Sequence, residues 1–186
     1  MKKIFKNLNF NKGFTLVESL VAISVFTIAI LGTFTAVQQG LATSGFAKDQ
    51  VVAFYLIQDA MEYVRNIRDE NGINSLNSVA SGGSAVPWLT GLSNVVTDPC
   101  YFGKVCRIDS YVKQAVDCSG SCANINQDSS TGLFGYTVGW PATKFKREIR
   151  FQQISSNEIV VIVSVSWTSG VFSKNITVRE TLFNMR

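Results

Sequence analysis

Apolar side chains dominate one long run near the start of the chain. From Phe14 to Val37 the only ionisable side chain is Glu18, and apolar residues occupy every face that a helix would have. A run of about 20 apolar residues is long enough to cross a bilayer as an α-helix. The pattern therefore predicts a transmembrane helix over 14–37, with a carboxylate at its fifth position.

Beyond this run the hydrophobic pattern becomes amphipathic, with apolar residues at helical spacing on one face. This apolar stripe consists of Val52, Leu56, Ala60, Val64 and Ile67. Asn71-Gly72 is typical of a helix C-terminus, so we expect the helix to end there. The prediction is one long helix whose second half, 38–71, is the spine of a head domain.

The end of the chain shows the alternation of β-strands. Three apolar runs, 145–154, 158–167 and 171–182, are separated by short turn-rich gaps, which favours an antiparallel meander. In the second run, the residues on one face are Ile159, Val161, Val163, Val165 and Trp167. We expect this face to cover the apolar stripe of the helix. The fold class is then α+β, with a long N-terminal helix on an antiparallel sheet and a head over 72–186.

The positive charge of the chain is confined to its start. The net charge is +4, and the four lysines before Gly13 account for it, because the other 13 basic residues balance the 13 acidic ones. These lysines are Lys2, Lys3, Lys6 and Lys12. A basic patch for nucleic acid is therefore not indicated. Lysines on one side of an apolar run favour the cytoplasmic side, so the head is expected outside the cytoplasm.

All four cysteines lie within a short segment of the expected head. They are Cys100, Cys106, Cys118 and Cys122. An even number of cysteines outside the cytoplasm predicts two disulfides, with three connectivities possible, and sequence-adjacent pairing is our preferred one. A zinc site is the alternative, but the spacing is unusual and the chain has no histidine.

The opening stretch, KGFTLVESLVAISVFTIAILG, resembles the N-terminus of type IV prepilins and type II secretion pseudopilins, and especially of their minor subunits. The resemblance lies in a short basic leader (1–13), Gly13 at the cleavage point, Phe14 after it, Glu18 as the fifth mature residue and then the apolar run. It implies that a prepilin peptidase cuts between Gly13 and Phe14 and methylates the new amine. It also implies that Glu18 neutralises the Phe14 amine of a neighbouring subunit during assembly.

Small residues recur along the apolar run at helical spacing, and they permit close packing of helices. They are Ala22, Ala29, Gly32 and Ala36. Some relatives have a kinking proline where this chain has Thr35, so we expect no proline kink. The alternative interpretation of Glu18 is a carboxylate that reaches the membrane interface from a helix end.

The resemblance implies a structural subunit, not an enzyme, with no cofactor. Its partners would be other pilin or pseudopilin subunits, the prepilin peptidase, the inner-membrane assembly platform and the membrane itself. The runner-up is a monomeric, membrane-anchored binding or adhesion protein, for which an exposed Trp140 would be a candidate contact. A calcium loop beginning in 124–128 is a further possibility, although the later Gly and Glu of such loops are missing. The sequence does not separate a pilus from a secretion or DNA-uptake system.

Overall fold

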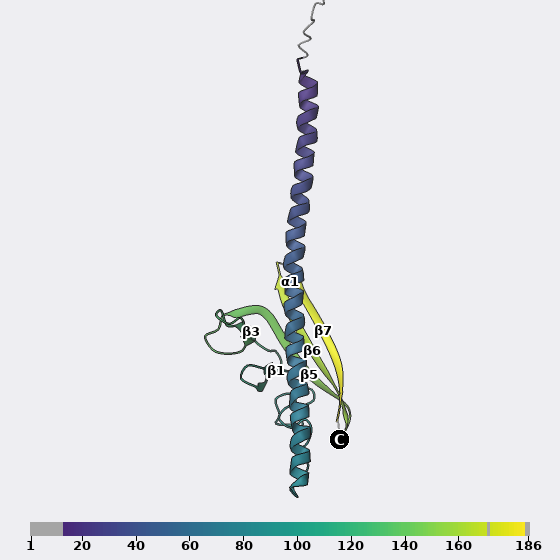
Figure 1. The fold of residues 1–186 in the computed structure, drawn as a ribbon, viewed down its shortest axis with the longest axis vertical. Coiled ribbons are helices and arrows are strands. Elements are labelled where there is room, and N and C mark those ends of the chain that lie inside the picture. The colour runs from purple at the N-terminus through teal and green to yellow at the C-terminus, as the bar shows by residue number, and fades with distance from the viewer. Residues whose placement is uncertain (1–12, 171, 185–186) are drawn as a thin grey trace, which may run out of the picture. The chain divides into compact units, whose positions relative to one another are not determined.

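A computed structural model of the chain describes residues 13–170 and 172–184, so most of the expected leader lies outside the described residues. The chain divides into two compact units, one up to Ala47 and the other from Lys48. One helix, α1 (Leu16–Ala80), is shared by both units and is followed by seven strands (Figure 1). It continues without interruption through Thr35, as expected in the absence of proline.

The helix does not end at Asn71-Gly72, so the predicted C-terminus was wrong. Asn71 is buried, and its amide nitrogen donates hydrogen bonds to the carbonyl oxygens of Trp88 at 3.2 Å and Thr90 at 3.0 Å. Its side chain therefore anchors the next segment and does not stop the helix. The helix ends nine residues later than expected, at Ala80.

A Schellman motif forms the actual end of α1. Gly82 has a φ of 78°, its N–H donates to the Val79 carbonyl, and the Gly83 N–H donates to the Ser78 carbonyl at 2.8 Å. The left-handed conformation at Gly82 is the one that favours glycine at this position of a helix C-terminus. The sequence signal was therefore present, in the Ser-Gly-Gly that follows Ala80, but the earlier Asn-Gly pair masked it.

Seven strands form one antiparallel sheet in the unit that begins at Lys48. The strands are β1 (Cys106–Asp109), β2 (Gln114–Asp117), β3 (Asn124–Gln127), β4 (Phe134–Gly135), β5 (Ala142–Ser155), β6 (Glu158–Ser169) and β7 (Phe172–Phe183). The expected meander is confirmed as β5, β6 and β7. The other four strands are short and were not predicted, because runs of two to four residues carry little periodic signal.

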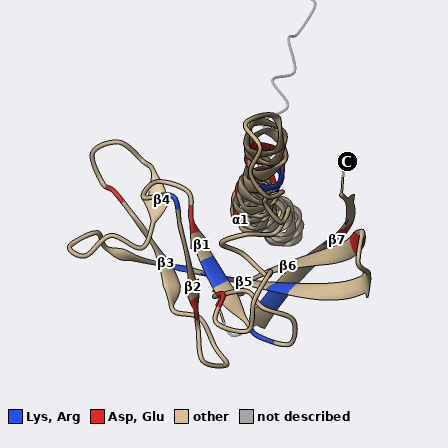
Figure 2. Ribbon diagram, turned by 90° about the horizontal axis from the view of Figure 1, so that it is seen from below, with Lys and Arg blue, Asp and Glu red and all other residues tan. Residues whose placement is uncertain are grey.

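The long strand β5 organises the sheet. One of its edges pairs with β6, which pairs in turn with β7. Its other edge pairs with β3 and with β1, and each of these carries a short partner, β4 and β2 respectively. In Figure 2, β7 and the β1–β4 region lie at opposite sides of the sheet, with α1 on one face.

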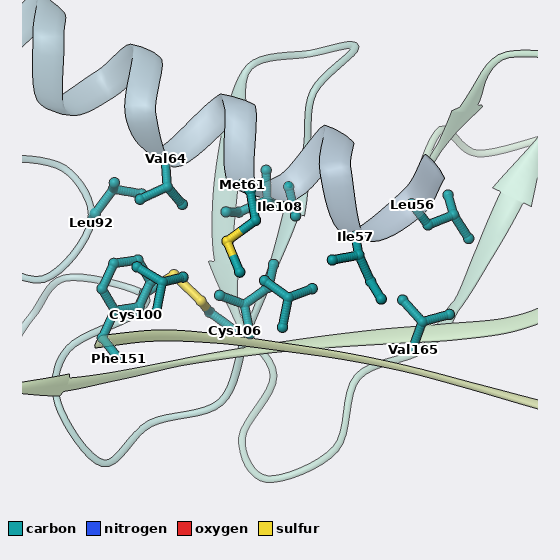
Figure 3. Packing of buried hydrophobic residues seen from close by; sticks show 14 of the residues in the cluster. Leu56, Ile57, Met61, Val64, Leu92, Cys100, Cys106, Ile108, Phe151 and Val165 are labelled. Carbon is teal, nitrogen blue, oxygen red and sulfur yellow. A yellow bond between two sulfur atoms is a disulfide. The ribbon is translucent and has the colours of Figure 1, made fainter. Parts of the chain in front are cut away.

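The core lies between the sheet and one face of α1. The predicted alternation in β6 is confirmed, since all five of its inward residues are buried, from Ile159 to Trp167. On the helix, Leu56, Ala60 and Val64 are buried as expected, while Val52 and Ile67 lie partly buried at its edge. Further buried helix residues are Ala53, Ile57 and Met61, so the buried face is centred slightly away from the predicted stripe. Figure 3 shows Ile57, Met61 and Val64 pointing from the helix towards the sheet, where Phe151 and Val165 lie.

One charged side chain of β5, Arg147, is buried in this core. Its guanidinium donates to the carbonyl oxygens of Leu56 at 2.6 Å and Ile108 at 2.5 Å. It also forms an ion pair of 2.7 Å with Asp59, whose carboxylate accepts a hydrogen bond from Ser110. Arg147 thereby connects α1, β1 and β5.

A second buried polar group holds the turn after β1. Asp109 accepts hydrogen bonds from the backbone N–H groups of Tyr111, Val112 and Tyr136. The guanidinium of Arg107 lies 4.5 Å from the centre of the Tyr136 ring. Burial raises the pKa of the Tyr136 phenol, so this side chain is neutral over the physiological range.

Candidate functional site

The helix α1 begins with a capping arrangement around the residues expected to be functional. Thr15 precedes the first helical residue, and its hydroxyl oxygen accepts a hydrogen bond from the Glu18 N–H at 3.3 Å. Thr15-x-x-Glu18 has the spacing of a capping box, in which the hydroxyl satisfies a free N–H of the first turn. The sequence analysis noted Glu18 but missed Thr15, although the Thr-x-x-Glu spacing could have identified it.

The first helical turn is also a favourable place for a negative charge. Glu18 is the acidic residue of this turn, close to the partial positive charge of the helix N-terminus. Gly13 and Phe14 come directly before Thr15 and are exposed. The structure thus brings Gly13, Phe14 and Glu18 within one turn of the helix start, with the Phe14 side chain 78% exposed.

Within the described residues, no side chain covers the apolar half of α1. None of its apolar side chains between Phe14 and Val37 is buried, and the most hydrophobic window of the helix is 0% buried. By length and composition this helix could cross a membrane. An uncovered apolar surface on all sides needs either lipid or other apolar helices around it.

The hydroxyl groups in this segment are already satisfied. Each of its five serine and threonine side chains from Ser19 to Thr35 donates to a carbonyl three or four residues earlier in the helix. Internal bonding of this kind lowers the cost of placing a hydroxyl in an apolar environment. Among the described side chains of this segment, Glu18 is then the one ionisable group. In an apolar environment its charge would still need a partner of opposite charge.

The four small residues predicted for helix packing lie within the continuous helix and are exposed. Ala22, Ala29, Gly32 and Ala36 are separated by seven, three and four residues, which places them along one side of α1. A Cβ atom added at Gly32 would meet nothing within 4 Å. The close approach of a second helix therefore remains a prediction.

The cysteines form two disulfides, and the described residues include no free cysteine. Cys100 is joined to Cys106, and Cys118 to Cys122, which is the sequence-adjacent pairing. The first bridge is completely buried among the core residues in Figure 3. The second closes the turn that follows β2, and Cys118 lies at its partly exposed end.

The tryptophans and the suggested calcium loop of the head can also be located in the structure. Trp88 and Trp167 are buried, whereas Trp140 is partly exposed and packs on Tyr111 with ring centres 5.2 Å apart. The proposed calcium loop begins in strand β3, where the amides of Asn124 and Asn126 donate to backbone carbonyls. Within 13–170 and 172–184 no group of three or more His, Cys, Asp or Glu side chains could hold a metal ion.

Comparison with known families finds one match, at the N-terminus. Residues 8–34 match the family model described as the prokaryotic N-terminal methylation motif. No curated protein and no solved structure matches the chain. The matched region contains the capped helix start and most of the uncovered apolar run.

The motif and the α+β fold together support a type IV prepilin-like protein. They suggest a structural protein and not an enzyme, and the apolar helix fits a membrane-anchored pilin. The motif also implies processing by a peptidase and assembly with other pilin-like subunits.

Proposed function

We propose that this chain is a minor structural subunit of a type IV pilus or a type II secretion pseudopilus, assembled through its N-terminal helix. A leader over 1–13 is removed, 14–37 passes from the membrane into the filament core, and the remainder forms an extracytoplasmic head. The N-terminal lysines hold the leader in the cytoplasm until it is cleaved.

One observation carries this proposal: an apolar helix with no covering partner starts with a single carboxylate in a capped first turn. Lipid tails are as apolar as neighbouring side chains, so the hydrophobic effect does not drive such helices together within a membrane. A carboxylate and an amine in an apolar setting do attract, and they also fix the axial position of one helix against the next. Pairing of Glu18 with the Phe14 amine of a neighbour would supply this force.

The position of the pair also explains why cleavage comes before assembly. In the precursor, the Phe14 nitrogen is part of the peptide bond to Gly13 and carries no charge. Cleavage creates an ammonium group close to the start of α1. The charge that Glu18 needs as its partner therefore exists only in the mature protein.

Mass spectrometry of the membrane fraction tests the processing step. We expect a mature form that begins at Phe14 with one added methyl group, because the Gly13-Phe14 junction lies within the matched methylation motif. A Gly13→Val variant should keep the leader, while a Gly45→Val variant, altered at an exposed helical position far from the junction, should be processed normally. A mature wild-type protein that still contains Lys2 and Lys3 would contradict the proposal.

A further inference from the structure

A cavity with a volume of about 360 Å³ lies between α1 and two loops of the head. Ligand sites in proteins have volumes of about 300–1,000 Å³, so this one can hold a small ligand or one unit of a longer ligand. All of its lining residues belong to the unit that begins at Lys48. They include Tyr55 and Asp59 of α1, Ser110 and Tyr111 of the turn after β1, and Leu133 and Phe134 at the start of β4.

Two tyrosine rings form walls of this cavity. The side chains of Tyr55 and Tyr111 are 66% and 57% exposed. Tyr111 is held from two sides, because its N–H donates to Asp109 at 3.0 Å and its ring packs on Trp140. Neither phenol group has a hydrogen-bond partner among the described residues. Both rings and both phenol groups are therefore available to a ligand, and the Tyr111 ring is already ordered before the ligand binds.

The carboxylate of the cavity, Asp59, is also fixed in position. Arg147 and Ser110 both donate to its Oδ2 atom, at 2.7 Å and 2.8 Å. Its Oδ1 atom has no partner in the part of the chain that the structure describes, so it can accept a hydrogen bond from a ligand. The charge of the carboxylate is already compensated, because the guanidinium of Arg147 lies in direct contact with it.

These contacts define the class of ligand. Tyrosine faces can attract a cation, but the one carboxylate of this cavity already has Arg147 as its counter-charge, so an added cation would have no counter-charge of its own. A wholly apolar ligand would cover the Asp59 oxygen and the two phenol groups without replacing their hydrogen bonds to water, which costs free energy. The ligand that meets both conditions is uncharged, with one apolar face and several hydroxyl groups.

We propose that this cavity binds one pyranose ring of an uncharged carbohydrate. One face of a pyranose consists of C–H groups, and their weakly positive hydrogens are attracted to the negative face of a tyrosine ring. The hydroxyl groups lie around the edge of the sugar, where one donates to Oδ1 of Asp59 and others bond to the phenol groups of Tyr55 and Tyr111. Because the cavity lies within the unit that begins at Lys48, this binding does not depend on assembly through the N-terminal helix.

Saturation-transfer NMR of the full chain tests this proposal. The probes are the methyl glycosides of glucose, galactose, mannose and N-acetylglucosamine. The detergent must contain no sugar, so octaethylene glycol monododecyl ether is used. We expect saturable binding of at least one probe to the wild-type chain. Failure of all four probes to bind would overturn the proposal, while the proposed role in a filament would be unaffected.

Variants at Tyr55 locate the binding. Tyr55→Ala should weaken it about tenfold, because one wall of the cavity is lost. Tyr55→Phe should weaken it much less, since the ring remains. Tyr55 is exposed and has no polar partner among the described residues, so neither change should affect folding. Phe54→Ala is the matched control, because this neighbouring aromatic side chain is 49% exposed and does not line the cavity. It should bind the sugar as the wild type does.

Tetramethylammonium distinguishes a sugar site from a cation site, because it is attracted to aromatic faces but cannot donate a hydrogen bond to Asp59. We expect that it does not displace the bound methyl glycoside. Displacement by tetramethylammonium, or sugar binding that Tyr55→Ala leaves unchanged, would overturn the proposal.

Discussion

Arg147 brings a full positive charge into the head, where its side chain is 3% exposed. Two of its hydrogen bonds go to the carbonyl oxygens of Leu56 and Ile108, which belong to different elements. Burial of a charge is costly unless the charge is both paired and hydrogen-bonded. The value of Arg147 therefore lies in holding α1 against β1 and β5 in one arrangement, with Asp59 as the counter-charge.

Substitution of the two partners should have unequal effects on stability. Arg147→Met should lower the free energy of unfolding of the head by about 3 kcal/mol, because two buried carbonyls and Asp59 lose their donor. Asp59→Asn should cost less, about 2 kcal/mol: it leaves the buried Arg147 charge without its counter-charge, but the amide oxygen can still accept the hydrogen bond and solvent reaches the 41% exposed side chain. Urea unfolding of the full chain in detergent, followed by tryptophan fluorescence, measures both. Equal losses would contradict this assignment of roles.

At the scale of elements, the two disulfides differ in their surroundings. The Cys100–Cys106 bridge is completely buried, while the Cys118–Cys122 bridge closes a turn and is partly exposed at Cys118. The loops that they close are of similar length, six and four residues apart in sequence, so loop entropy alone would make them similar in effect. We therefore expect the two bridges to differ in their contribution to stability because only the first is packed in the core.

Replacement of each pair by alanine should reveal this difference. Loss of Cys118–Cys122 should destabilise the head by about 2 kcal/mol, which is the contribution expected from a short loop. Loss of Cys100–Cys106 should cost more, about 3–5 kcal/mol, because it also leaves a cavity among buried side chains. Urea unfolding of the two double variants checks the order. Titration of the denatured, unreduced protein should find no free thiol, and four reactive thiols would refute both bridges.

The elements that the sequence predicted are those whose hydrophobic pattern continues over many residues. Strand β6 alternates over ten residues, and β5 and β7 are long runs on either side of it, separated from it by turn-rich gaps. Helix α1 carries its apolar stripe over many turns, so these elements were recognisable. The end of α1 was missed because Asn71 looks locally like a helix stop but is used for a tertiary contact. Strands β1 to β4 depend on pairing with β5 and with each other, which a local pattern does not reveal.

For the whole molecule, the candidate site was the most predictable part and the polar core the least. Gly13, Phe14 and Glu18 are recognisable from their order in the sequence alone, because their proposed roles depend on distance from a helix start. Thr15 required the capping spacing, and Arg147 required the fold, since its partners lie 39 or more residues away. Candidate functional residues close together at one end of a helix can be recognised from a short stretch of sequence. A buried polar network joins residues far apart in the sequence and cannot.

The molecule also contains two kinds of apolar surface. In the unit that begins at Lys48, the sheet covers one face of α1, so its apolar side chains are buried without a second subunit. In the unit that ends at Ala47, the apolar side chains are uncovered and require lipid or other helices. We therefore expect head stability and subunit assembly to be separable, so that changes at Glu18 leave the unfolding of the head unaffected.

Incorporation of the Glu18→Ala variant into filaments tests the central claim most directly. The variant should insert into the membrane and be cleaved at Gly13, but its yield in cross-linked or co-purified filaments should fall roughly a hundredfold or more, because the Phe14 ammonium of the neighbour would enter an apolar core unpaired. Glu18→Gln should be intermediate. Ser19→Ala, which removes a polar group from the same turn without changing the charge, should assemble normally. Incorporation of Glu18→Ala at the wild-type level would contradict the account.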